Sequence, residues 1–215
     1  MARKALENLE GVIKFQLDFR EGPSPAETLL AELNSWRTRF RTLGLIGQDP
    51  ERYEGLGFGN LSRRLPSGKD NVFIISGTQT GHLEQLQAKH FATVLQCDPM
   101  ANQLQAFGQV KPSSEALSHG ILYQNNLDVR WVMHLHSPDI FKNYRALKLP
   151  CTDPAAAYGT PDMAAAIQAL AKSRDGTDSN LLVMGGHQDG ILAYGSDAQT
   201  TGQLVITTLA KALRC

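Results

Sequence analysis

Hydrophobic and polar positions alternate near the start of the chain and then recur at helical spacing. Four apolar side chains alternate with polar ones at about residues 12–19, which predicts a half-buried strand. From Ser24 onward, a proline at the next position and a glutamate three residues after the serine predict a capped helix that runs to Gly44. Its apolar stripe, Leu29, Leu33, Trp36, Phe40 and Leu43, is expected to face the core. The strand is interpreted as an N-terminal addition to the fold.

Short apolar runs separated by turn residues follow this helix. Strands are expected at about 57–64, 72–76, 91–97, 103–107, 131–136, 181–184 and 191–194. Helices are expected at about 114–124, 161–172 and 197–213. Strands outnumber helical crossovers, so we predict an α/β fold, a three-layer αβα sandwich with a mixed, largely antiparallel central sheet. The length of 215 residues suits one domain, 1–215, with a substantial core.

The strand at 131–136, Trp-Val-Met-His-Leu-His, is the most informative of these elements. Successive strand side chains alternate faces, so His134 and His136 point to the same side. Ser137 and Pro138 then supply an N-cap and a proline at the first helical position, which ends the strand. Two adjacent imidazoles suit a metal ion, although a pair of core or surface histidines is the alternative from these residues alone.

Four further segments place small or polar residues at predicted turns. Lys-Pro-Ser-Ser-Glu at 111–115 enters a helix, where backbone N–H groups and hydroxyls suit an anion. A glutamate at the position of Glu115 more commonly serves as a first-turn carboxylate that complements the helix dipole. His187 lies in a glycine-rich turn between two predicted strands and is by itself typical of an exposed turn residue. The turns at 57–64 and 76–78 have backbone that can close around a phosphate, although ordinary turns use the same residues.

Charge and cysteine content narrow the class of partner. The chain carries 21 basic and 21 acidic residues, interspersed, so nothing indicates a nucleic-acid or membrane surface and a small-molecule partner is favoured. Its three cysteines are far apart and form no CxxC pair, which favours reduced thiols and a cytoplasmic location. The first ten residues lack the apolar stretch of a signal peptide, and no run reaches the roughly 18 apolar residues of a membrane span.

Taken in order, the motifs resemble the class II aldolase/adducin family over about residues 25–213. The family's motifs are Gly-Asn-aliphatic-Ser-x-Arg, a phosphate loop, Lys-Pro-Ser-Ser-Glu, His-x-His-Ser/Thr and a later turn containing histidine. In this sequence they stand at 59–64, 74–77, 111–115, 134–137 and 186–190. One departure is that Ile74 and Ile75 replace the Thr-Pro of the family's phosphate loop. The resemblance implies the same αβα sandwich.

The resemblance also implies a site. Three histidines, His134, His136 and His187, would bind a divalent ion. Zn²⁺ is the favoured ion, with Mn²⁺, Co²⁺ or Fe²⁺ as alternatives. Glu115 matches the family glutamate that coordinates zinc in the resting enzyme and acts as acid/base when substrate displaces it. The implied phosphate-binding residues are Asn60, Ser76, Gly77, Ser113 and Ser114.

The implied function is that of a lyase, an aldolase that cleaves or forms a C–C bond in a small hydroxycarbonyl compound, a sugar phosphate, through a metal-stabilised enediolate. An epimerase or dehydratase acting on a sugar phosphate is the alternative. A non-catalytic adducin-like binding domain is less favoured, because such domains lose the metal-ligand pattern. The resemblance further implies a homo-oligomer, a tetramer, whose sites lie between subunits. Tyr144 and Tyr158 are the candidate tyrosines for proton donation in a neighbour's site.

Overall fold

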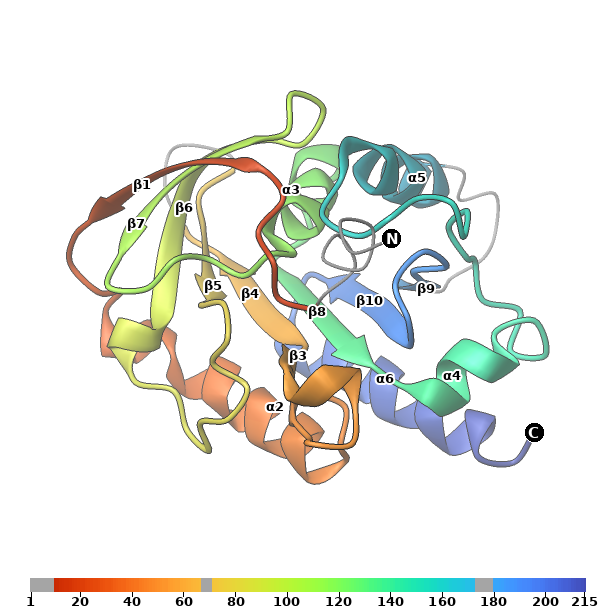
Figure 1. Ribbon diagram of the computed structural model, residues 1–215. Helices are drawn as coiled ribbons and strands as arrows, with labels where there is room; N and C mark the ends of the chain where they lie inside the picture. Colours follow the sequence, from red (N-terminus) through yellow and green to blue (C-terminus); the bar gives the residue numbers. More distant parts are fainter. Residues whose placement is uncertain (1–9, 67–70, 173–179) are drawn as a thin grey trace.

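The computed structural model describes residues 10–66, 71–172 and 180–215, and an eight-stranded sheet forms its middle layer (Figure 1). The strand order is β1-β7-β6-β5-β4-β8-β10-β9. The bounds are β1 (Gln16–Glu21), β4 (Asn60–Arg64), β5 (Phe73–Ser76), β6 (Phe91–Asp98), β7 (Gln103–Gly108), β8 (Trp131–His136), β9 (Leu181–Val183) and β10 (Gly190–Gly195). All neighbours pair antiparallel except β1 and β7, which run parallel, so the predicted mixed, largely antiparallel sheet is confirmed.

Helices cover both faces of this sheet and complete the predicted sandwich (Figure 1). On one face lie α3 (Ala116–Asn125) and α5 (Pro161–Lys172). On the other lie α2 (Ala31–Thr42), α4 (Pro138–Asn143) and α6 (Ala198–Ala212). The minor elements are β2 (Gly47–Gln48), which pairs with β3 (Gly57–Phe58), and the short 3-10 helices η1 (Glu27–Leu29), η2 (Tyr53–Gly55) and η3 (Ala88–His90).

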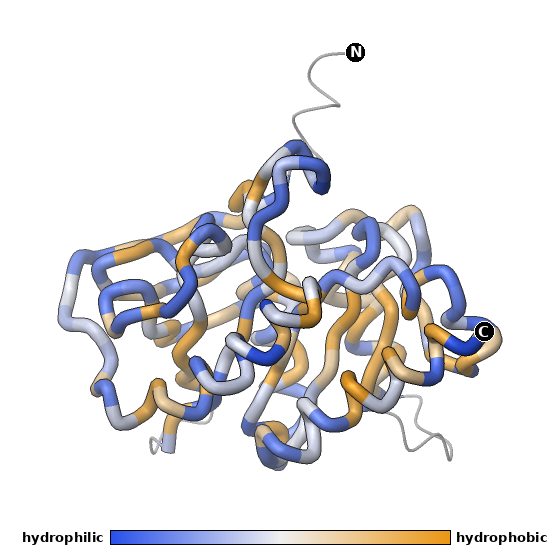
Figure 2. Tube along the Cα trace, turned by 90° about the horizontal axis from the view of Figure 1, so that it is seen from below, coloured by the Kyte–Doolittle hydropathy of each residue, from blue (hydrophilic) through white to orange (hydrophobic). Residues whose placement is uncertain are grey.

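Side-chain alternation divides the interior into two cores, one on each face of the sheet. On β8, Val132 packs into the core beneath α3 and α5, whereas Trp131 and Met133 pack into the core beneath α2, α4 and α6. Figure 2, which views the molecule from the side of α2 and α6, shows hydrophobic residues along the central strands and hydrophilic ones in the peripheral turns. Both cores therefore clamp β8, and its two histidines stand on a fixed strand. No helix in the described ranges is both long enough and apolar enough to cross a membrane.

Local capping signals predicted some helix starts well and one badly. The Ser137 hydroxyl accepts a hydrogen bond from the Ile140 N–H (3.3 Å), and the Asp197 carboxylate accepts one from the Thr200 N–H (2.7 Å), as expected for N-caps. The predicted capped start at Ser24 is wrong, because α2 begins at Ala31. Ala26 is extended (φ −62°, ψ 134°), so the turn that a Ser24 cap requires does not form.

The N-terminal strand also differs from its predicted bounds. It spans Gln16–Glu21 instead of about 12–19, because its pairing with β7 starts at Gln16 opposite Gln103. Residues 10–15 form neither strand nor helix in the described part of the chain. They run from the start of β1 toward the end of β8 (Figure 1).

Candidate metal centre

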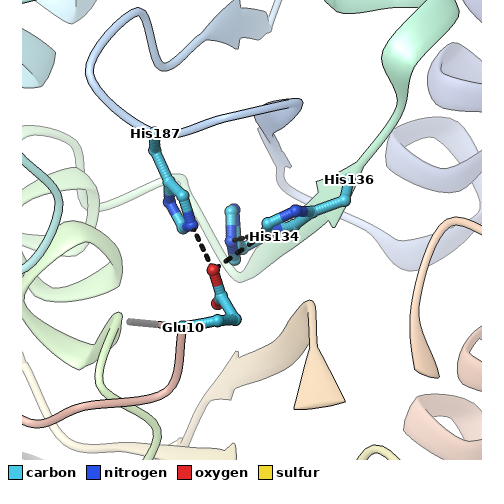
Figure 3. A group of neighbouring side chains, drawn as sticks. All are labelled: Glu10, His134, His136 and His187. Atoms are coloured by element: carbon cyan, nitrogen blue, oxygen red, sulfur yellow. Dashed lines mark hydrogen bonds and ion pairs between the residues drawn. The ribbon is translucent and has the colours of Figure 1, made fainter. Parts of the chain in front are cut away.

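Three histidines from two parts of the chain converge at the end of β8 (Figure 3). His134 and His136 come from that strand, and His187 comes from the turn between β9 and β10. Antiparallel pairing sets His136 opposite Gly190, and the Gly190 N–H donates to the His187 carbonyl (3.0 Å), which closes the turn. The ring centroids lie 4.7–4.9 Å apart, so the predicted grouping of these histidines is present.

The strand histidines have the protonation state and orientation that metal ligands need. Burial, together with the nearby imidazole of His187, holds the pKa of both His134 and His136 well below its ordinary value, so both rings are neutral. The Nδ1 of His134 lies 3.1 Å from the Ile191 carbonyl, which places its proton there and leaves the Nε2 lone pair free. That Nε2 lies 3.1 Å from the Nε2 of His136.

Glu10 supplies a carboxylate to the same cluster. Its Oε2 lies 2.7 Å from the Nε2 of His187 and 3.9 Å from the Nε2 of His136 (Figure 3). Burial lowers the pKa of His187, but the carboxylates of Glu10 and Glu115 outweigh it, so the net shift is upward.

This donor set fits a divalent ion. One ligand atom from each of Glu10, His134, His136 and His187 lies within 4.8 Å of all the others. In a tetrahedral zinc site with bonds of 2.0–2.2 Å, ligand atoms stand roughly 3.3 Å apart. The separations of 2.7, 3.1 and 3.9 Å given above lie on either side of that spacing, so side-chain shifts of a fraction of an ångström would accommodate an ion.

Glu115, the predicted carboxylate ligand, lies on the other side of His187. It is fully buried at the N-terminal end of α3, with Oε1 3.5 Å from the Nδ1 of His187 and Oε2 accepting from the Ser118 hydroxyl (2.9 Å). Burial raises its pKa above the ordinary value for glutamate. In this conformation Glu115 reaches the cluster through His187, and Glu10 occupies the carboxylate position within it.

Four of the five predicted phosphate-binding residues line one small hollow beside the cluster. These are Asn60, Gly77, Ser113 and Ser114. Gly77 forms a β-bridge with Pro112, which brings the two loops together. Ser76 is the exception, because its hydroxyl accepts from the Leu61 N–H (3.2 Å) and its carbonyl accepts from the Ser113 N–H (3.2 Å). Ser76 therefore holds these walls in place.

A second hollow on the other side of Glu10 is walled by two aromatic rings. Tyr158 stacks on His187 with centroids 4.6 Å apart, and the Tyr53 ring lies 4.6 Å from that of His136. The Tyr53 hydroxyl donates to the Asp189 carboxylate (2.9 Å). Tyr144, the other candidate tyrosine, packs instead against the core beneath α2, α4 and α6.

Sequence reasoning missed Glu10 and Tyr53. Glu10 stands outside every motif, and the contact it makes with His187 joins residues 177 positions apart. Tyr53 adopts a left-handed backbone conformation (φ 49°), and an aromatic residue in the sequence does not indicate such a turn.

Comparison with known proteins agrees with this architecture. The chain resembles L-fuculose-1-phosphate aldolase from Thermus thermophilus (TM-score 0.62, 16% identity, covering 87% of this chain and 92% of that one) and a sugar-phosphate aldolase from Thermotoga maritima (TM-score 0.62, 12% identity, 87% and 94%). YgbL from Klebsiella pneumoniae, described as "a putative aldolase/epimerase/decarboxylase", is similar too (TM-score 0.60, 20% identity, 86% and 87%). At these identities the likeness shows the fold alone. The comparison with curated proteins gave no match.

Sequence adds what structural likeness at low identity does not. The profile described as "Class II Aldolase and Adducin N-terminal domain" matches residues 51–213, about three quarters of the chain. This segment contains the three histidines and Glu115, whereas Glu10 precedes it. The chain belongs to the class II aldolase and adducin N-terminal domain family.

Proposed function

We propose that this protein is a metal-dependent lyase that cleaves or forms a C–C bond in a small hydroxycarbonyl compound, most simply a sugar phosphate. One observation carries the proposal, namely the convergence of three buried imidazoles beside a hollow lined by serines, an asparagine and glycines. Family membership and the sugar-phosphate aldolases among similar structures support it. An adducin-like scaffold would not need this donor set.

The histidines and Glu115 have separate roles in this proposal. The ion is held by His134, His136 and His187. Zn²⁺ is the favoured ion, although Mn²⁺, Co²⁺ and Fe²⁺ accept the same ligands. The ion would supply the positive charge that polarises a carbonyl group. Glu115 takes and returns a proton as the acid/base. Its raised pKa suits this role, because a catalytic group works best when its pKa lies near the operating pH.

The hollow beside the cluster binds the anionic end of the substrate in this proposal. Ser113 and Ser114 stand at the entry to α3, whose N-terminal N–H groups favour a negative charge. The Oδ1 of Asn60 is buried and makes no hydrogen bond within the described residues, so Asn60 retains hydrogen-bonding capacity beside the cluster. Asn60 pairs directly with His134 across β4 and β8, which sets the distance between anion and metal.

The proposal also covers the cellular location and the oligomeric state of the protein. Cys97, Cys151 and Cys215 are all free, which agrees with a reducing cytoplasm. We also propose a homotetramer with a site near each subunit boundary. Tyr158 already stacks on His187 of its own chain, so it is the candidate proton donor that needs no neighbour.

The decisive experiment compares metal-loaded with chelator-treated protein on a panel of phosphorylated and free ketoses. We expect aldehyde release from a phosphorylated ketose that chelation abolishes and Zn²⁺ or Mn²⁺ restores. Epimerised or dehydrated product without cleavage would replace the lyase assignment by the corresponding alternative. Metal-independent turnover, or a metal-loaded protein inert on the whole panel, would contradict the proposal. Light scattering on the same preparation gives the subunit number.

A further inference from the structure

The segment that carries Glu10 is held across the site by contacts of its own. We call residues 10–15 the N-terminal strap. The Thr78 hydroxyl donates to the Gly11 carbonyl (2.9 Å), and the Asn102 amide donates to the Lys14 carbonyl (3.1 Å). The Lys14 ammonium donates to the Tyr158 carbonyl (3.1 Å) and lies 3.5 Å from the centroid of that ring. The strap is therefore anchored on both sides of the site.

Glu10 stands between the two hollows and lines both. One hollow has the glycine and serine walls, and the other has Tyr53 and Tyr158. The Glu10 side chain is only 9% exposed, and it points into the histidine cluster instead of toward solvent (Figure 3). A buried carboxylate is costly unless a positive charge faces it.

Charge balance favours a divalent ion as that partner. Glu10 and Glu115 approach opposite edges of the same imidazole, at 2.7 Å from Nε2 and 3.5 Å from Nδ1 of His187. A divalent cation within the histidine cluster would place two positive charges directly beside the Glu10 carboxylate. The carboxylate oxygen of Glu10 also lies at the ligand spacing described above.

We propose that Glu10 is the fourth protein ligand of the metal ion, and that metal binding fastens the N-terminal strap across the site. The inference rests on the proposed metal site of His134, His136 and His187. It leaves Glu115, on the far edge of His187, free to transfer protons. Three imidazoles and the Glu10 carboxylate would together supply four protein ligands, so a substrate would compete with the Glu10 carboxylate for a place beside them.

Metal affinity tests this ligand directly. Glu10→Gln keeps the shape of the side chain and a hydrogen-bonding oxygen but removes the charge. We expect Zn²⁺, measured by competition with a chromophoric chelator, to bind about 10–100-fold more weakly than to wild type. The visible spectrum of the Co²⁺ form should change as one oxygen ligand is lost. Glu54→Gln, which neutralises an exposed carboxylate on the wall of the same hollow, is the matched control and should leave both readouts unchanged.

Hydrogen exchange tests the strap. In wild type, Zn²⁺ should slow the exchange of backbone amides in residues 11–15, and in Glu10→Gln this slowing should be absent. Thr78→Val removes one anchor of the strap and leaves every ligand in place, so its loss of metal affinity should be smaller than that of Glu10→Gln. This variant also provides a readout if Glu10→Gln fails to fold.

The outcomes separate the two proposals. Wild type that binds no divalent ion overturns the metal site and the role of Glu10 together. Wild type and Glu10→Gln with equal affinity and the same Co²⁺ spectrum overturn the role of Glu10 and leave the three-histidine site standing. Tighter binding by Glu10→Gln also overturns it, because Glu10 would then compete with the metal for His187.

Discussion

Two buried polar clusters on the same face of the sheet contain histidine, one of them a single ring and the other three, and their surroundings differ. In one, the Nδ1 of His119 lies 2.6 Å from the Ser62 hydroxyl, which in turn lies 2.7 Å from the Tyr123 hydroxyl. In the other, the candidate metal centre, three imidazoles meet the carboxylate of Glu10. Burial alone lowers the pKa of His119 to about 3, so neutrality is common to His119 and the strand histidines. Convergence of ring nitrogens on a carboxylate is what distinguishes the candidate metal centre.

Helix α3 links the two groups. Glu115 and His119 stand four residues apart, on the same face of the helix, yet Glu115 approaches His187 while His119 faces β4. One helical turn thus separates a proposed acid/base from a structural histidine. Substitutions in the histidine cluster, at Glu115 and at His119 test whether the two clusters have these different roles.

The largest effect is expected from removing the strand ligands. His134→Ala combined with His136→Ala should abolish stoichiometric binding of Zn²⁺, a loss of at least about a hundredfold in affinity, since even outer groups around metal sites contribute 10–100-fold. His119→Gln should bind Zn²⁺ as wild type does. Elemental analysis after dialysis, with circular dichroism as a check of folding, makes the measurement. Equal metal content in the double variant and wild type would remove the distinction between the two groups.

Next in size is the effect of Glu115→Gln on turnover. The amide cannot exchange a proton at neutral pH, so kcat should fall by about 10²–10⁴. Zn²⁺ affinity should change much less than kcat, because Glu10 occupies the carboxylate position. Steady-state kinetics on the substrate found in the panel, with chelator competition on the same samples, separates the two quantities. Unchanged kcat would exclude the acid/base role, and a loss of Zn²⁺ as large as that of the double variant would make Glu115 the ligand.

The smallest effect concerns stability and pH in the His119 network. A histidine with a folded pKa of about 3 and an ordinary pKa of 6.5 binds fewer protons folded than unfolded between these values. Its contribution is present above pH 6.5 and is lost on acidification, by about 1.4 kcal/mol for each pH unit down to about 3. In His119→Gln the free energy of unfolding of the metal-free protein should fall less steeply across this window. Denaturant titrations at several pH values measure both slopes, and parallel slopes would show that His119 does not titrate as its burial implies.

Features determined by residues close together in the sequence could be predicted, and features that depend on contacts between distant residues could not. The face shared by His134 and His136 and the cap at Ser137 depend on neighbours within a few residues, so local pattern predicted them. The prediction for the start of α2 was wrong, because Ala26 is extended and the chain therefore does not enter a helix at the Ser24 motif. The position of Glu10 depends on a contact across 177 residues and on the pairing of β1 with β7, and no local pattern contains either.

The short covalent path from Glu10 to β1 has a consequence for which molecules the site accepts. As the proposed metal ligand, Glu10 would be tethered to β1 through only five residues, 11–15, and would have an effective concentration on the order of millimolar or above, set by the tether and not by the solution. A competing carboxylate with one oxygen must exceed that concentration to displace it. A hydroxycarbonyl compound would offer two adjacent oxygens from one molecule, so it would lose the translational and rotational entropy of one molecule while making two contacts. The strap would then act as a threshold that favours chelating substrates over the simple organic acids that surround them.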